Sequence, residues 1–221
     1  MTYLKIIILL FLYSNLSFGS SENIEDCGTH SENRSIVMIN EENQKDLWST
    51  EQARDLSFCI SPVFRSSYEI VETATRAAAT EWMKYGNFDF NLSDNLSCDN
   101  KTRKVLFQIV PTTRKAKFKA RAFFPSSERR KIQINRRFAN QDPREMKRLM
   151  LHELGHVLGI RHEHIHPDAG DDCLENGEFE AITAYDPYSI MHYPICGPKK
   201  LQNFVLSDLD KEGISILYPM E

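Results

Sequence analysis

The chain has 221 residues, enough for one substantial hydrophobic core and little beyond it. Its hydrophobic content of 41% and charged content of 26% are ordinary for a globular protein, and there is no internal repeat or low-complexity tract. The formal net charge of −4 indicates neither an acidic nor a basic partner, and nucleic-acid binding is not expected because no recognition motif accompanies the basic residues between positions 101 and 150.

The N-terminus is predicted to be a secretory signal. Lys5 precedes the apolar run 6–13, which is too short for a bilayer span of about 20 residues. Ser17 and Gly19 supply the small residues typical of a cleavage site, so residues 1–19 are expected to be removed. A membrane anchor at this end is the alternative. We expect an exported protein without an anchor, extracellular or, if its source is bacterial, periplasmic.

Cysteine usage is consistent with export, because disulfides form in oxidising compartments. A bridge between Cys173 and Cys196 would brace the segment between them, and Cys59 and Cys98 would then form a second pair. Cys27 is left over. Sequence alone does not fix this pairing.

Polarity changes near residue 50. Residues 20–50 are polar and lack periodicity, as in a short propeptide or N-terminal arm, whereas residues 51–221 are predicted to form the folded domain. Ser66 and Glu69 have the spacing of a capping box that opens a helix, whose apolar stripe is Val71, Ala74, Ala78 and Trp82. Strands are expected at residues 56–60, 88–92, 105–110, 120–124 and 132–134.

Asp142 is predicted to cap a second helix, with Pro143 in the first turn and Glu145 at the third position. This helix is expected to continue through apolar residues to position 152. A last helix is expected to begin near residues 206–210 and to end near Pro219.

Residues 152–162 read HELGHVLGIRH and predict a metal site. On a helix with 3.6 residues per turn, His152 and His156 lie on one face with Glu153 beside them. Gly159 can end the helix in the left-handed region, so that His162 turns back toward the same ion. Three neutral imidazoles and one open position are typical of one catalytic Zn²⁺. Scattered surface histidines are the alternative, which fits this eleven-residue pattern poorly.

A second motif follows about thirty residues later, where residues 185–193 read YDPYSIMHY. Together the two motifs resemble the metzincin metalloproteases, and most of all the astacin family, over roughly the last three quarters of the chain. In that family the third histidine is followed by Glu, as Glu163 follows His162 here, and a Ser-x-Met-His-Tyr turn comes later, matched by residues 189–193.

The resemblance implies an α+β metzincin zinc-protease fold: a twisted mixed sheet with two long helices above an irregular C-terminal subdomain that carries a final helix. Residues 51–221 would be the zinc metalloprotease catalytic domain. Met191 would form the methionine turn beneath the zinc, and Tyr193 would stabilise the transition state. Glu153 would be the general base that activates the zinc-bound water.

Two further roles come from this resemblance. The strand at Ala120, Arg121, Ala122 and Phe123 is similar to the upper rim of the metzincin cleft, whose edge pairs with substrate; an ordinary core strand is the alternative. Cys27 is followed by Gly28, as in the propeptide Cys-Gly that keeps the related matrixins latent by capping the metal. An unpaired or intermolecularly paired cysteine is the alternative for Cys27.

The expected function is therefore that of a secreted zinc endopeptidase acting on protein or peptide substrates. A catalytically silent, zinc-bound module that binds peptides or partners is the competing interpretation. The presence of all three histidines with Glu153 and Tyr193 counts against it. The sequence does not indicate an oligomeric state.

Overall fold

The computed structural model describes residues 25–27, 44–93, 98, 105–140, 142–169, 180–193, 196 and 204–220. The expected signal sequence and Cys173 lie outside these residues. Within the described part of the chain, no helix has both the length and the apolar character needed to cross a membrane.

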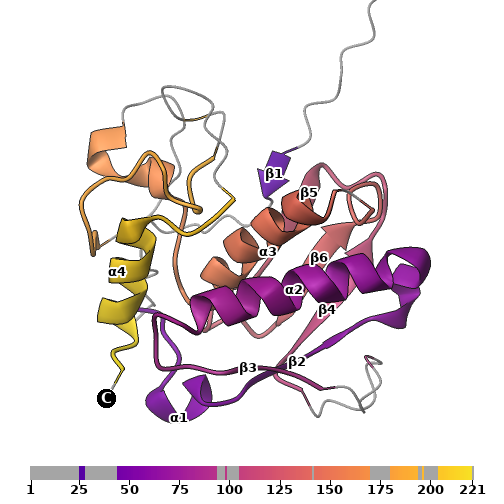
Figure 1. Cartoon of the computed structure of the whole chain (residues 1–221), viewed down its shortest axis with the longest axis horizontal. Helices are drawn as coiled ribbons and strands as arrows, with labels where there is room; N and C mark the ends of the chain where they lie inside the picture. The colour runs from indigo at the N-terminus through magenta and orange to yellow at the C-terminus, as the bar shows by residue number, and fades with distance from the viewer. Residues whose placement is uncertain are drawn as a thin grey trace, which may run out of the picture.

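The described residues contain a six-stranded mixed sheet (Figure 1). From one edge to the other its strands are β1 (Glu25–Cys27), β5 (Phe118–Arg121), β6 (Lys131–Asn135), β4 (Phe107–Thr112), β2 (Leu56–Ile60) and β3 (Phe90–Leu92). The β5–β6 pair is antiparallel and every other pair is parallel. The α+β architecture with a mixed sheet is confirmed.

All five predicted strands occur: the strand at 56–60 is confirmed with the same bounds, and the bounds of the other four shift. The strand predicted at 120–124 is β5, which begins at Phe118 and ends at Arg121, and Ala122, Phe123 and Phe124 follow it in the core. The strand predicted at 88–92 begins only at Phe90. Strand β1, the short strand nearest the N-terminus, was not predicted from the sequence.

Two long helices, α2 (Tyr68–Trp82) and α3 (Pro143–Val157), run side by side across the sheet (Figure 1). All four residues of the predicted α2 stripe are buried. The predicted capping box at Ser66 and Glu69 is wrong. A 3₁₀-helix, η1 (Pro62–Ser67), takes up Ser66, and α2 starts from Ser67 without a side-chain cap.

The N-terminus of α3 is as predicted. The Asp142 carboxylate accepts a hydrogen bond from the Arg144 N–H at 2.9 Å, and Pro143 occupies the first turn. Trp82 of α2 joins the two helices, since its indole N–H donates to the Leu151 carbonyl at 2.9 Å.

The carbonyl groups at the C-terminal end of α3 accept hydrogen bonds from residues that are distant in sequence. A helix end leaves carbonyls without intrahelical partners. The Trp48 indole N–H donates to the Val157 carbonyl at 2.7 Å, and the Tyr218 hydroxyl donates to the Leu158 carbonyl at 3.0 Å. Trp48 and Asp46 are both buried, and the Asp46 carboxylate accepts hydrogen bonds from the Ser126 N–H and hydroxyl. The segment around Trp48 is therefore packed into the domain.

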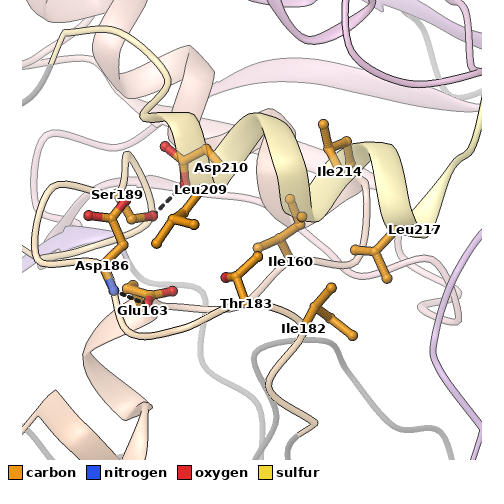
Figure 2. A pocket seen from close by; sticks show the side chains of 11 residues that line it. Ile160, Glu163, Ile182, Thr183, Asp186, Ser189, Leu209, Asp210, Ile214 and Leu217 are labelled. Carbon is orange, nitrogen blue, oxygen red and sulfur yellow. Dashed lines mark hydrogen bonds between the residues drawn. The ribbon is translucent and has the colours of Figure 1, made fainter.

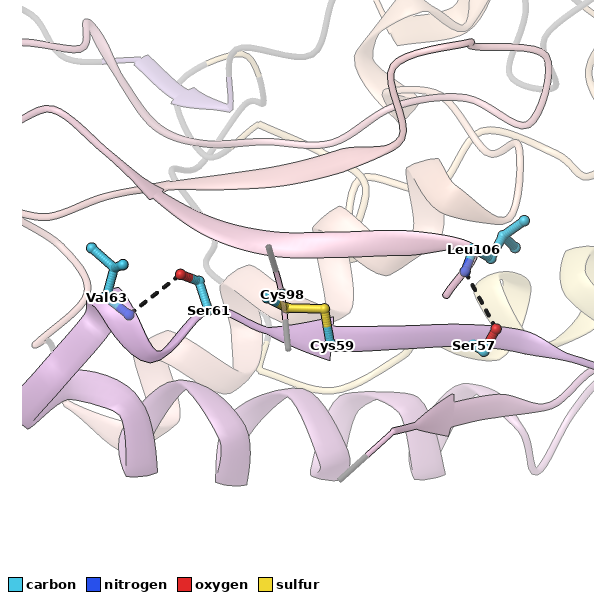
Figure 3. Close-up of a disulfide and its surroundings, with 6 residues drawn as sticks. All are labelled: Ser57, Cys59, Ser61, Val63, Cys98 and Leu106. Atoms are coloured by element: carbon cyan, nitrogen blue, oxygen red, sulfur yellow. Dashed lines mark hydrogen bonds between the residues drawn. A yellow bond between two sulfur atoms is a disulfide. The ribbon is translucent and has the colours of Figure 1, made fainter. Parts of the chain in front are cut away.

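Shorter elements complete the fold. They are α1 (Thr50–Ala53), the 3₁₀-helices η2 (Glu163–Ile165) and η3 (Pro167–Ala169), and α4 (Asp208–Leu217), the predicted final helix. A disulfide joins Cys59 of β2 to Cys98, as expected (Figure 3). Cys196 is also disulfide-bonded, but its expected partner, Cys173, lies outside the described residues.

Gly159→Ala should destabilise the protein by about 2–4 kcal/mol. Gly159 has φ +92°, where a side chain is strained, and an added Cβ would lie 2.5 Å from the Asp46 carbonyl oxygen. Urea unfolding measures the change. Gly213→Ala is the matched control: its Cβ would meet nothing closer than 3.6 Å, and alanine should stabilise α4 by up to about 1 kcal/mol. Equal effects of the two variants would contradict this prediction.

Candidate metal centre

Helix α3 carries His152 and His156 on one face, with Glu153 next to them, and all three side chains are buried. The Nδ1 of His152 lies 2.9 Å from the Ile190 carbonyl oxygen, and the Nδ1 of His156 lies 2.8 Å from the Ile160 carbonyl oxygen. A carbonyl only accepts, so each Nδ1 carries the proton. Each Nε2 then presents a lone pair, as a metal ligand requires.

The chain reverses after α3 and brings His162 to the same place. Its Nε2 lies 3.1 Å from the Nε2 of His156. Strand β1 brings Cys27 to the same place, with its Sγ 3.5 Å from the His156 Nε2 and 3.7 Å from Glu153 Oε2. The three histidines of the sequence motif and Cys27 therefore lie together in one buried cluster.

The cluster fits a zinc ion. The ligand atoms of Cys27, His152, His156 and His162 all lie within 4.8 Å of one another. Zinc bonds of about 2.0–2.3 Å place tetrahedral ligand atoms about 3.3–3.8 Å apart. Small side-chain adjustments would bring the four atoms to this geometry, and thiolate and imidazole are both preferred zinc ligands.

Met191 lies directly beneath α3. A Cβ at Gly155 would overlap the Met191 sulfur, so glycine is what allows this close approach. The Met191 carbonyl accepts a hydrogen bond from the Glu163 N–H at 3.1 Å, and the Met191 N–H donates to the Ser189 hydroxyl at 3.0 Å. The turn is thereby attached to the segment that carries His162.

Glu163 is buried behind the third histidine. Its Oε1 accepts a hydrogen bond from the Asp186 N–H at 2.7 Å (Figure 2). Burial is the main cause that raises the pKa of Glu163 to about 8, and the nearby carboxylates of Asp210 and Asp186 add to it. This side chain lines a small pocket together with Asp186, Asp210 and the apolar residues Ile160, Leu209 and Ile214.

Tyr193 contacts both the histidines and strand β1. Its ring centroid lies 4.3 Å from that of His162 and 4.6 Å from that of His164. Its hydroxyl donates to the Cys27 carbonyl oxygen at 2.6 Å. His164, which the sequence did not single out, is thus part of the aromatic surroundings of the cluster.

The four residues predicted to form the substrate rim divide into two pairs. Ala120 and Arg121 belong to β5, and Ala120 pairs with Cys27 of β1. Ala122 and Phe123 follow the strand and are buried in the core. The edge of β5 is therefore covered by β1 in this structure.

The groups that bind the Nδ1 atoms of the histidines could not be predicted from the sequence. They are the main-chain carbonyl of Ile190, which binds His152, and that of Ile160, which binds His156. Every residue has a main-chain carbonyl, so residue types do not indicate which carbonyl lies next to a histidine in the folded protein.

No protein-family model matches the sequence. No curated protein matches it either. Solved structures do resemble it. A structure of myroilysin is 19% identical, covers 80% of this chain and 97% of its own, and has a TM-score of 0.57. High choriolytic enzyme 1, a hatching enzyme zinc-protease from Oryzias latipes (medaka fish), is 16% identical, covers 79% and 98%, and has a TM-score of 0.55. The chain thus shares its fold with myroilysin and with this hatching-enzyme zinc-protease.

Proposed function

We propose that the chain is a secreted zinc-dependent endopeptidase that hydrolyses peptide bonds in proteins. The observation that carries the proposal is the buried convergence of three imidazoles and Glu153 within a zinc-protease fold. The disulfide between Cys59 and Cys98 supports secretion, because such bonds persist in oxidising compartments.

His152, His156 and His162 would hold one zinc ion. Zinc in this position supplies a Lewis acid that makes water nucleophilic at neutral pH. Glu153, beside the first histidine, would take the proton of the attacking water and pass it to the leaving amine. Tyr193 would donate a hydrogen bond to the scissile carbonyl oxygen as negative charge develops there.

We further propose that the structure corresponds to a latent form in which Cys27 is a fourth zinc ligand. The Cys27 thiol lies against Glu153 and His156, and its carbonyl accepts the Tyr193 hydroxyl. Strand β1 also covers β5, the edge to which an extended peptide substrate would add. One residue thus contributes a ligand to the proposed zinc site and contacts two groups of the proposed mechanism, Glu153 and Tyr193.

The domain boundary at residue 50 stays a prediction, and the contacts of the preceding segment favour an earlier start. Asp46 and Trp48 are buried and bind groups of the catalytic domain. We propose that the mature enzyme begins between Cys27 and Asp46, so that activation removes Cys27 and retains Trp48.

Glu153→Gln should retain zinc and reduce kcat by about a hundredfold to ten-thousandfold, because the amide cannot accept the proton of water. Hydrolysis of a quenched casein substrate by trimmed protein, with zinc content measured in parallel, checks this. Glu72→Gln on α2 is the matched control and should have normal activity. Equal zinc content in the wild type and in Glu153→Gln, with no activity in either protein, would favour the silent binding module instead.

Cys27→Ala should raise the activity of the untrimmed chain by about tenfold or more, because the variant lacks the proposed fourth metal ligand. A tenfold change corresponds to about 1.4 kcal/mol of lost stabilisation of the latent form. The measurement is the initial rate on a quenched peptide before any N-terminal cleavage, followed by mass spectrometry. Cys27→Ala combined with Glu153→Gln controls for a contaminating protease. The same latency as wild type would exclude a role for the Cys27 thiol.

A chain that begins at residue 44 should fold and be active, whereas one that begins at residue 50 should have a Tm lower by roughly 6–12 °C, because it lacks the buried Trp48. Thermal unfolding of both measures the difference. Trp48→Phe in the longer chain isolates the lost hydrogen bond to Val157 and should have a smaller effect. Equal Tm values would place the start of the domain after Trp48.

A further inference from the structure

Asp210 connects the final helix to the methionine turn. Its Oδ1 accepts a hydrogen bond from the Ser189 hydroxyl at 2.6 Å, and its Oδ2 accepts one from the Ile190 N–H at 2.9 Å. Figure 2 shows Asp210 on α4 directed at Ser189 in the facing loop. Ser189 in turn accepts from the Met191 N–H. A single carboxylate therefore fixes two consecutive residues of the turn.

The Ile190 residue extends this connection to the metal centre. Its N–H donates to Asp210, and its carbonyl accepts from Nδ1–H of His152. The partner of a ligand's second ring nitrogen sets the tautomer and the orientation of the ring. The position of the Ile190 carbonyl therefore decides where the His152 Nε2 points.

We propose that Asp210 is a positioning residue of the metal centre, which acts on His152 through Ile190. This inference rests on the zinc site of the proposed function and deepens it. The carboxylate lies on an element that contributes no ligand, so the final helix becomes part of the support of the site.

Asp210 also takes part in the cap of its own helix, which is the competing explanation for its presence. The Ser207 N–H donates to Asp210 Oδ2 at 2.9 Å, and the Asp210 N–H donates to the Ser207 hydroxyl at 2.9 Å. Ser207→Ala removes the side-chain half of this capping box but leaves both bonds from Asp210 to the turn. The two roles can therefore be separated.

The test compares Asp210→Ala, Asp210→Asn and Ser207→Ala in the full chain carrying Glu153→Gln, which prevents autolysis. Zinc affinity is measured by competition with a chromogenic chelator, and the Tm of each protein is measured without and with zinc. Asp210→Ala should lose zinc affinity by about tenfold, the lower end of the range for a lost outer-shell partner, because the direct partner of His152, the Ile190 carbonyl, remains. Its Tm should also rise less on zinc addition than that of the parent.

Ser207→Ala should lower the Tm of the zinc-free protein and keep zinc affinity within about twofold, because a lost cap acts on the helix alone. Asp210→Asn should recover much of the affinity, since its carbonyl oxygen can still accept from the Ile190 N–H. If Asp210→Ala fails to fold, Asp210→Ser takes its place, because its shorter side chain also removes the carboxylate that accepts from the Ile190 N–H.

Two results would overturn the inference: parental zinc affinity in Asp210→Ala, or in Asp210→Ser where that variant takes its place; and an equal loss of zinc affinity in Ser207→Ala. A parent that binds zinc while the Asp210 variants match it would refute only the positioning role. A parent that binds no zinc would refute the proposed function itself.

Discussion

The candidate metal centre depends on the reversal of the chain at Gly159. A straight helix can present only His152 and His156 to one ion, so the third ligand requires a sharp turn directly after the last helical residue. The positive φ of Gly159 provides this turn, and the carbonyl of Asp46 packs where a Cβ would otherwise stand. The turn is also closed from outside, since Trp48 and Tyr218 bind the carbonyls that the helix end leaves exposed. The ligand set is therefore held by segments from both ends of the domain.

The orientation of the individual imidazoles also depends on segments outside α3. His152 and His156 follow each other on one helix, yet their Nδ1 atoms bind carbonyls from two separate segments, at Ile190 and Ile160. The Ile160 carbonyl belongs to the reversal after Gly159, whereas the Ile190 carbonyl belongs to the methionine turn. Ring orientation thus requires that both segments be correctly placed against α3, which explains why Gly155 leaves room for Met191. Burial of the histidines makes each of these bonds stronger than it would be in water.

The sequence predicted the features whose physical cause is local. Asp142 and Pro143 determine where α3 begins, and Gly159 determines where the chain turns, because capping and backbone conformation depend on a few adjacent residues. Local signals were insufficient where a neighbouring element competes, as at Ser66, which lies in a 3₁₀-helix rather than in a capping box. They carried no information on contacts across the domain. The pairing of Cys27 with Ala120 and the bonds of Asp210 to the turn arise only when distant segments pack together.

The position of Cys27 has a consequence for how latency would end. Its thiol and its carbonyl point to different groups, the thiol to His156 and Glu153 and the carbonyl to Tyr193. Chemical modification of the sulfur would remove the proposed fourth ligand but leave the Tyr193 hydroxyl engaged and the β5 edge covered. Removal of the strand by cleavage releases all three at once. Because the main-chain pairing with β5 does not depend on the thiol, proteolysis would activate the proposed latent form more completely than oxidation of Cys27.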